Sequence, residues 1–230
     1  MRHALAALAA AGALASCGGG GDEPLKVTAA SSLKVALTEY ASDGVALAFA
    51  GSDQLAAQIR QGARPDVFVA ANEKLPADLH AEGLTQPPVR IASNRLVLAV
   101  SAGTSAVRSP EDLARDGVRI AVAARGVPAG DYAQRVLDSL PRAGANVRSR
   151  EPDVSGVVGK LLQRAVDAGF VYATDVRASR GGLREIALPP RLAPDVRYAA
   201  VVVRDSPRAR AFVDGLRGAP ALRAAGFGPP

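Results

Sequence analysis

The chain is poor in the residues that carry disulfide, zinc and histidine chemistry. Its 230 residues include one cysteine, two histidines and no tryptophan, and only 4% are aromatic. A single cysteine cannot form an internal disulfide, and one thiol with two imidazoles is too small a set of soft ligands for a zinc site. We therefore expect neither a disulfide-stabilised fold nor a bound metal cation, and no cofactor is predicted.

The chain also lacks a dense run of one charge. It has 28 basic residues, 24 of them arginine, against 22 acidic residues, for a net charge of +6. Apart from Arg2, the arginines are spread over residues 60–223, whereas nucleic-acid surfaces usually combine clustered positive charge with stacking aromatics. We predict no nucleic-acid partner. With 48% hydrophobic residues, the chain can bury the core of one or two globular domains.

The amino-terminal residues are typical of an export signal. Residues 4–16 form an uncharged, mostly apolar stretch after Met1-Arg2-His3, too short for a stable membrane span but long enough for a signal peptide. The stretch ends in Leu14-Ala15-Ser16-Cys17, which resembles the bacterial lipobox. We expect removal of residues 1–16 and lipid attachment at Cys17. Residues 17–24, with four consecutive glycines, would then form a flexible tether to the membrane.

From residue 25 on, short apolar runs alternate with helical patterns. This alternation predicts an α/β fold in which helices flank the sheets. Proline-rich stretches at residues 85–88 and 189–194 divide the pattern into two lobes joined by two crossings, with a ligand cleft between them. Strands are predicted at residues 25–29, 45–49, 67–71, 96–100, 119–122, 170–172, 185–188 and 199–203, and helices starting near residues 33, 54, 75, 110, 132, 157 and 207.

Small residues and hydroxyls follow the first two predicted strands. Ser31 and Ser32 follow the first strand, and Ser52 follows the second; each precedes a predicted helix. A serine at such a junction can cap the helix or help to hold an anion at its amino terminus. Capping is the simpler interpretation of each serine taken alone.

Two later segments also place small residues or N-cap candidates directly before a predicted helix. Residues 127–130 (Val-Pro-Ala-Gly) and 152–155 (Pro-Asp-Val-Ser) each precede a predicted helix, and Asp153 fits an N-cap. Four helix starts that converge on a cleft would supply enough neutral donors for an oxyanion. Tyr172 ends a predicted strand where an α/β cleft lies, whereas Asp66 and Asp175 fit turn or cap positions better than catalytic ones.

Taken together, these segments resemble the periplasmic molybdate-binding proteins of ABC transporters. They occur in the order of that family and cover almost the whole chain after the tether. The segments that carry the resemblance are residues 29–33, 49–52, 58–59, 62–63, 66–71, 94–97, 127–133, 153–154, 171–172 and Asp175.

The resemblance implies a two-lobed type II periplasmic-binding fold, with two mixed sheets flanked by helices and a cleft between the lobes. Residues 25–93 and 197–230 would form lobe I, and residues 94–196 lobe II. It further implies an extracytoplasmic monomer that binds molybdate or tungstate and delivers it to an ABC permease. By motif position, the oxyanion would be held by Ser32, Ser52, Ala129, Val154 and Tyr172.

The sequence departs from the family pattern in places. Asp53 follows Ser52 where a small neutral residue is usual, and a carboxylate there would repel a dianion unless it points outward. Ala199 follows Tyr198 where proline is common. The helix at residues 33–40 and the end at residues 220–227 are shorter than usual.

Three other functions remain open from the residues. The first is binding of another tetrahedral oxyanion, such as sulfate or phosphate. The second is a hydrolase that uses Ser31 or Ser32, but after processing only His80 remains, in a polar segment where an exposed position is expected, so the serine lacks a base. The third is a structural or adhesive lipoprotein. We therefore predict a binding protein and not an enzyme.

Overall fold

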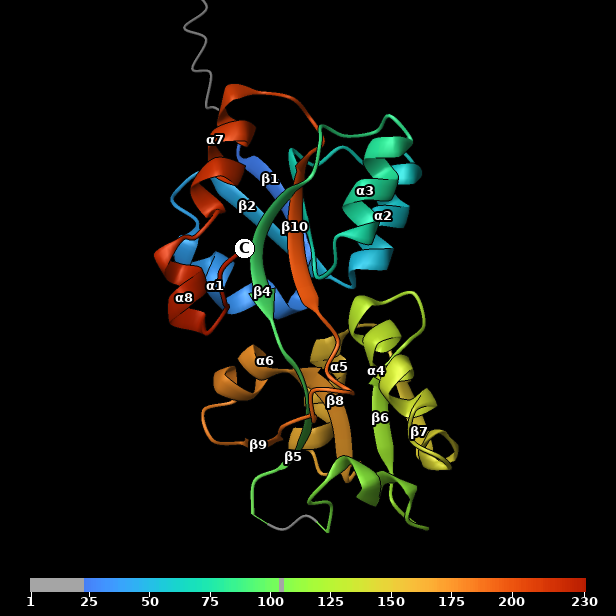
Figure 1. Cartoon of the computed structure of the whole chain (residues 1–230). Coiled ribbons are helices and arrows are strands. Elements are labelled where there is room, and N and C mark those ends of the chain that lie inside the picture. Colours follow the sequence, from blue (N-terminus) through green and yellow to red (C-terminus); the bar gives the residue numbers. More distant parts are fainter. Residues whose placement is uncertain (1–22, 104–105) are drawn as a thin grey trace, which may run out of the picture.

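The computed structural model describes residues 23–103 and 106–230, which form two lobes, one above the other in Figure 1. The predicted signal peptide at residues 1–16 and the predicted lipid site at Cys17 lie outside the described residues. In the part that is described, no helix has the length and apolar character needed to cross a membrane.

The first lobe is built on a mixed five-stranded sheet. The strand order is β2-β1-β3-β10-β4, in which β1 is parallel to β2 and β3, and β10 is antiparallel to β3 and β4. The strands are β1 (Leu25–Ala30), β2 (Val45–Ala50), β3 (Val67–Ala70), β4 (Val89–Asn94) and β10 (Val196–Val202). The helices of this lobe are η1 (Ser31–Leu33), α1 (Lys34–Tyr40), α2 (Ser52–Arg60), α3 (Lys74–Ala81), α7 (Pro207–Leu216) and α8 (Pro220–Ala225).

The second lobe repeats this plan. Its strand order is β7-β6-β8-β5-β9, in which β6 is parallel to β7 and β8, and β5 is antiparallel to β8 and β9. The strands are β5 (Leu96–Ser101), β6 (Ile120–Ala123), β7 (Val147–Glu151), β8 (Ala168–Tyr172) and β9 (Leu183–Ile186). The helical segments are η2 (Pro110–Ala114), α4 (Pro128–Asp138), η3 (Ala143–Asn146), α5 (Val154–Leu162) and α6 (Ala173–Ala178). Two mixed sheets flanked by helices confirm the predicted fold class.

The apolar runs of the sequence become the buried centre of each sheet. Every residue of β3, β6 and β8 is buried, as expected for strands covered on both faces. Helix α4 packs one face on its sheet, because its buried residues recur at the spacing of an amphipathic helix. The residues of that face are Ala129, Tyr132, Ala133, Val136 and Leu137.

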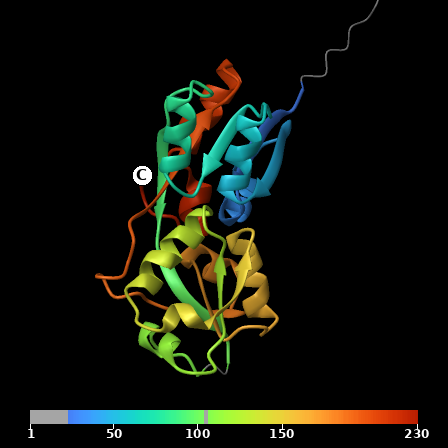
Figure 2. The same ribbon diagram turned by 90° about the vertical axis from the view of Figure 1, so that its right-hand side faces the viewer.

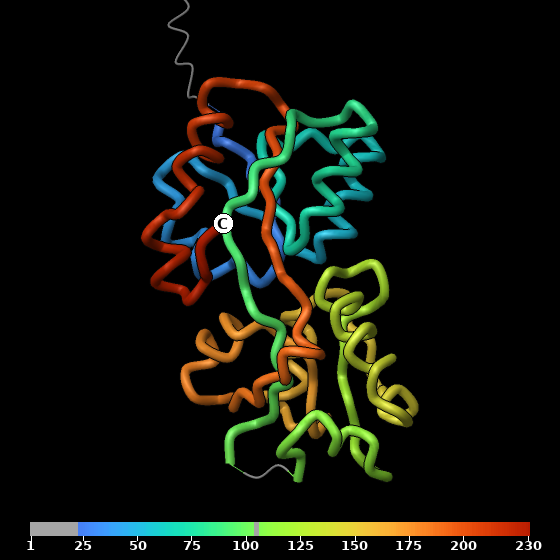
Figure 3. Tube along the Cα trace, in the orientation of Figure 1, coloured from blue at the N-terminus to red at the C-terminus, as the bar shows by residue number. Residues whose placement is uncertain are grey.

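The chain crosses between the lobes twice, and the two crossing segments run side by side in Figure 3. One crossing leads from β4 into β5, and the other leads from β9 into β10. The first crossing does not fall at the proline-rich stretch 85–88, which precedes β4 while the chain is still in the first sheet. Because β4 is an edge strand, prolines next to its start remove no hydrogen bond from the sheet interior.

Several elements differ from their predicted form. Strands β4 and β7 and helices α6 and α8 were not predicted, and the segment at Pro110 is a five-residue 3-10 helix. Strand β7 reads Val-Arg-Ser-Arg-Glu and lies at a sheet edge with its arginines exposed, so it has no apolar run to mark it. Helix α4 starts at Pro128, four residues before the predicted start near Tyr132.

Candidate functional site

A small cavity lies where the carboxyl ends of six strands meet between the lobes. In the first lobe these strands are β1, β2 and β3; in the second they are β6, β7 and β8, and Figure 2 shows the lobes facing each other. The cavity has a volume of about 200 Å³, including the space open to solvent. It is lined by Ala30, Ser31, Ser32, Ala50, Gly51, Ser52, Ala71, Val127, Pro128, Ala129, Asp153, Val154 and Tyr172.

All five residues that the family resemblance implies as oxyanion ligands line this one cavity, although they are far apart in the chain. They are Ser32, Ser52, Ala129, Val154 and Tyr172. Each lies at the end of a strand or in the first residues of the helical segment that follows it.

The two serines do not cap helices, so the capping interpretation was wrong for both. Neither η1 nor α2 has a side-chain cap. The Ser52 hydroxyl oxygen instead accepts a hydrogen bond of 3.1 Å from the amide of Ala71, at the end of β3. The Ser32 hydroxyl lies 2.8 Å from the hydroxyl of Tyr198. Both side chains are thus fixed by partners far away in the sequence.

Helices α4 and α5 point their amino termini at the cavity. In α4, Pro128 occupies the first position and has no N–H, so the amides of Ala129 and Gly130 are the first donors without a partner inside the helix. In α5, the Asp153 carboxylate accepts a 3.0 Å hydrogen bond from the amide of Gly156, as an N-cap. The amide of Val154 has no partner inside the helix. Free amides and the helix dipole favour an anion at both starts.

Tyr172 supplies a buried hydroxyl donor. Its hydroxyl oxygen is inaccessible to solvent and has no hydrogen-bond partner among the described residues. Burial raises the pKa of Tyr172 well above its ordinary value, so the group keeps its proton at neutral pH. A buried hydroxyl without a partner is costly unless a ligand accepts its hydrogen bond. The geometry of this residue therefore suits an acceptor bound in the cavity.

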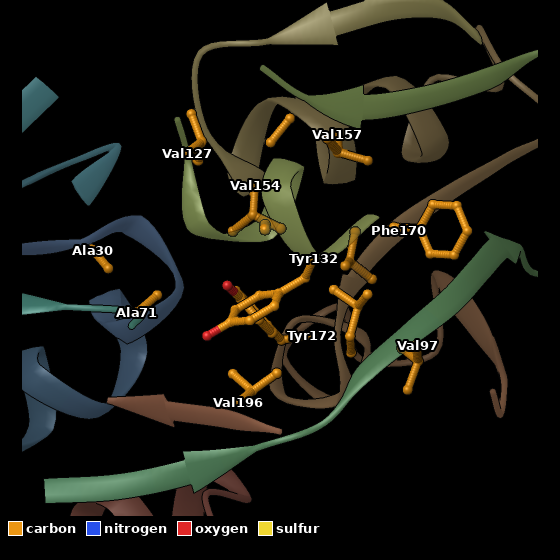
Figure 4. Close-up of a cluster of buried hydrophobic side chains, with 14 of the residues drawn as sticks. Ala30, Ala71, Val97, Val127, Tyr132, Val154, Val157, Phe170, Tyr172 and Val196 are labelled. Carbon is orange, nitrogen blue, oxygen red and sulfur yellow. The ribbon is translucent and has the colours of Figure 1, made fainter. Parts of the chain in front are cut away.

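Tyr132 lies next to Tyr172 and was not selected from the sequence as a site residue. Figure 4 shows the hydroxyl ends of both tyrosines directed toward the side where Ala30 and Ala71 of the first lobe lie. Burial raises the pKa of Tyr132 to about 12, and the Arg135 guanidinium lies over its ring, 4.8 Å from the ring centre. In the sequence, Tyr132 lies within residues 127–133, one of the segments that carry the family resemblance, one helical turn after Pro128.

Asp175 has the cap role that the sequence suggested. Its carboxylate accepts a 2.9 Å hydrogen bond from the amide of Tyr172 at the start of α6. Desolvation raises the pKa of Asp175 to about 7. Asp66 is also structural and does not line the cavity. It accepts a hydrogen bond from the Lys26 amide at 2.7 Å and lies 3.0 Å from the Arg204 guanidinium.

No lysine or arginine is among the residues that line the described cavity. Its one charged member is Asp153, the N-cap of α5. Asp53, which departs from the family pattern, does not line the cavity either. The Asp53 side chain lies close to Gly126 of the second lobe: a Cβ atom added at Gly126 would be 3.9 Å from Asp53 Oδ2. Its Oδ1 atom is buried and has no hydrogen-bond partner among the residues described.

The lobes touch beside the cavity, and Gly51 permits this contact. A Cβ atom at Gly51 would lie 2.7 Å from the carbonyl oxygen of Pro152, which belongs to the second lobe. Such a separation is shorter than side chains tolerate, so only glycine allows this approach of the two backbones. The structure is thus a closed form in which both lobes contribute to one cavity.

A wider groove adjoins the cavity between α1 and α8 of the first lobe and α5 and α6 of the second. Ser31 and Ser32 line both spaces, so the groove reaches the Ser32 side of the cavity. Val35 and Leu162, the two large hydrophobic residues that are most exposed among those described, lie one on each side of it.

The partners of Ser32 do not include a general base. Its hydroxyl contacts the hydroxyl of Tyr198, and His80 lies elsewhere, exposed near the end of α3 with Nδ1 2.9 Å from the carbonyl oxygen of Thr85. Across residues 23–103 and 106–230, no group of three histidine, cysteine or acidic side chains is arranged to hold a metal ion.

Two lobes joined by two crossings, with a cavity between them lined by neutral donors, define a two-lobed solute-binding protein. Residues 25–228 match the family of bacterial extracellular solute-binding proteins, and the chain belongs to this family.

Individual relatives confirm the resemblance seen in the sequence. The molybdate-binding protein ModA of Mycobacterium tuberculosis strain H37Rv is 34% identical over 165 residues, which is 67% of this chain and 63% of the relative's length. ModA of Escherichia coli K12 is 29% identical over 214 residues, covering 84% of this chain and 83% of the relative. The chain thus spans less than two thirds of the length of the mycobacterial relative.

The same fold is found in solved structures. The periplasmic molybdate-binding protein of Azotobacter vinelandii superposes with a TM-score of 0.79 at 25% identity, over 90% of this chain and 99% of that one. The sulfate-binding protein SubI of M. tuberculosis superposes with a TM-score of 0.72 at 16% identity, over 90% of this chain and 86% of that one. The second likeness shows the fold alone.

Proposed function

We propose that this protein captures molybdate or tungstate outside the cytoplasm and delivers it to an ABC permease. The observation that carries the proposal is the convergence of five separate chain segments on one cavity whose side-chain donors are neutral hydroxyls. These segments contribute Ser32, Ser52 and Tyr172, together with the helix starts at Ala129 and Val154. The similarity to molybdate-binding proteins supports the same ligand.

Neutral donors are sufficient to bind a dianion tightly. A hydrogen bond to a charged partner contributes about 1.5 to 3 kcal/mol, so several such bonds in a buried cavity can outweigh the desolvation of the anion. Hydroxyls and amides that keep their protons also bind a fully ionised oxyanion over a wide pH range. The raised pKa of Tyr172 fits this requirement.

Selectivity would follow from the rigidity of the cavity. Its amides belong to α4 and α5, which bury apolar residues in the second lobe, so the donors cannot follow a smaller anion inward without losing alignment. Sulfate is smaller than molybdate, and we therefore expect it to bind more weakly. Molybdate and tungstate are alike in charge and shape, and we expect both to bind.

The lobes would carry the signal to the permease. The anion accepts hydrogen bonds from both lobes, so its binding favours the closed arrangement over an open one. The two crossings at β4–β5 and β9–β10 are the segments about which the lobes would move.

A lipid at Cys17 would hold the protein at the outer side of a membrane. Strand β1 points its carboxyl end at the cavity, so its start at Leu25 faces away from it. A tether of residues 17–24 would leave the cleft free. We expect intact protein to fractionate with membranes and the Cys17→Ala variant to be released. Unmodified, soluble wild-type protein would contradict the anchor.

Calorimetry with molybdate, tungstate, sulfate and phosphate tests the ligand. Protein lacking residues 1–17 should bind molybdate and tungstate, with sulfate at least about 100-fold weaker, a difference of about 2.7 kcal/mol. Tight sulfate or phosphate binding without molybdate binding would assign a different oxyanion. No binding or thermal stabilisation with any of the four anions would favour the structural lipoprotein. Turnover of an ester that is abolished in Ser32→Ala would favour the hydrolase.

A further inference from the structure

We infer that Tyr198 is a positioning residue that turns the hydroxyl hydrogen of Ser32 toward the cavity. This inference rests on the proposed function, because it concerns how Ser32 meets a bound anion. Tyr198 is fully buried in β10 and does not line the cavity itself. Its hydroxyl lies 2.8 Å from that of Ser32, and either group can be the donor in this pair. The direction of the bond decides what Ser32 presents to a ligand.

Asn94 sets that direction. The Oδ1 atom of Asn94 accepts a 2.8 Å hydrogen bond from the amide of Arg95, which identifies the oxygen of the side-chain amide. The other end, Nδ2, is therefore the group that faces Thr174 Oγ1 at 2.9 Å and the Tyr198 hydroxyl at 3.5 Å. An amide nitrogen can only donate, so the Tyr198 oxygen accepts from Asn94.

The Tyr198 hydrogen needs an acceptor. Asn94 Nδ2 cannot accept it, and among the described residues the Ser32 oxygen is the remaining hydrogen-bond partner of the Tyr198 hydroxyl, so Tyr198 donates to Ser32. Ser32 then accepts from Tyr198, and its only hydrogen is free to donate into the cavity. Burial raises the pKa of Tyr198, so the tyrosine keeps the hydrogen it donates. Each bond in such a chain polarises the next and strengthens the final donor.

This series of hydrogen bonds also connects elements of both lobes. Asn94 ends β4 and Tyr198 lies near the start of β10, so both belong to the strands through which the chain crosses between lobes. The pairing of β10 with β4 shifts register between Tyr198 and Ala199, a bulge of the kind that re-aims a side chain. Thr174 belongs to α6 in the second lobe. The chain of hydrogen bonds therefore joins Ser32 to both crossings and to the opposite lobe.

Tyr198→Phe is a clean test, because it removes the hydroxyl and keeps the ring. The ring packs edge-on against Tyr172 and Phe227, with centroids 5.8 and 5.2 Å away, and phenylalanine retains both contacts. We expect the variant to bind molybdate about 3- to 10-fold more weakly, as for the loss of one supporting hydrogen bond. Tyr40→Phe is the matched control. It removes a tyrosine hydroxyl that donates to the Phe212 carbonyl, away from the cavity, and should leave affinity unchanged.

A double-mutant cycle separates positioning from a general structural effect. If Tyr198 acts through Ser32, then Tyr198→Phe should change affinity less than 2-fold once Ser32→Ala is present. Equal losses in both backgrounds, or wild-type affinity of Tyr198→Phe, would overturn the inference while leaving molybdate binding intact. If wild-type protein binds only sulfate or phosphate, the proposed ligand fails and the same cycle with that anion tests the inference. If it binds none of these anions, both fail.

Discussion

Gly51→Ala tests whether the closed contact between the lobes is needed for binding. The backbone of Gly51, with φ −61° and ψ 136°, lies in a region open to alanine, so the methyl group does not strain the first lobe by itself. In the closed form, however, the new Cβ would lie 2.7 Å from the Pro152 carbonyl oxygen and 2.7 Å from Asp53 Oδ1. The Asp53 side chain can rotate away, whereas the Pro152 backbone can move only with the second lobe.

The size of the effect follows from the cost of overpacking. An extra methyl group in a packed region costs about 1 to 3 kcal/mol, which corresponds to about 5- to 150-fold in affinity. Because this cost arises between the lobes, we expect it in the dissociation constant for molybdate measured by calorimetry. The melting temperature without ligand should change little, since each lobe keeps its own core.

Gly144→Ala is the matched control for this substitution. Apart from the backbone of its own helical turn, no described residue has an atom within 4 Å of a Cβ added at Gly144, so this variant should bind molybdate as the wild type does. Wild-type affinity of Gly51→Ala would show that the lobes bind molybdate without the close contact between Gly51 and Pro152. An equal loss in Gly144→Ala would show that the effect is not specific to the lobe contact.

Three further substitutions probe Tyr172 and two acidic residues outside the cavity, Asp53 and Asp175. Tyr172→Phe should weaken molybdate binding about 10- to 150-fold by calorimetry. The ligand-free melting temperature should not fall, because the lost hydroxyl has no hydrogen-bond partner among the described residues. Unchanged affinity would show that Tyr172 does not contact the anion. Asp53→Asn should tighten binding several-fold, most at low salt, because it removes a negative charge beside the cleft; weaker binding would mean that the charge assists closure. The pKa of Asp175 is about 7 in the folded protein, against an ordinary value of 3.8, so the folded state holds this proton more tightly than the unfolded chain does. The free energy of unfolding of the wild type should therefore fall by at most about 4 kcal/mol as pH rises from 4 through 7. Asp175→Asn should flatten this part of the profile in denaturant titrations, and a profile that stays unchanged would contradict the assignment.

Much of the fold could be predicted because burial leaves a plain signal. Strands such as β3 and β8 are buried on both faces and read as short apolar runs. Strand β7 has neighbours on one side only and exposes Arg148 and Arg150, so its sequence resembles a polar loop. Strand β4 follows two prolines, which suggested a break between lobes and not the start of an edge strand.

The candidate site could be predicted in part. Serines and glycines after strands marked the four junctions, and the family resemblance selected one residue at each. The capping interpretation failed because the partners of Ser32 and Ser52 are set by tertiary structure: Tyr198 is 166 residues away from Ser32, and Ala71 is 19 residues from Ser52. No local pattern encodes such pairings. For the same reason, the contact between Asn94 and Tyr198 could not be predicted.

The position of the bound anion would show whether the cavity between the lobes is the binding site. Crystals grown with molybdate and measured near the molybdenum absorption edge would show the metal atom by its anomalous scattering. We expect one strong peak in the cavity between the lobes. The oxygens of the anion should lie within hydrogen-bonding distance of the hydroxyls of Ser32, Ser52 and Tyr172 and of the amides of Ala129 and Val154. A peak elsewhere, or no peak in protein saturated with molybdate, would contradict this expectation.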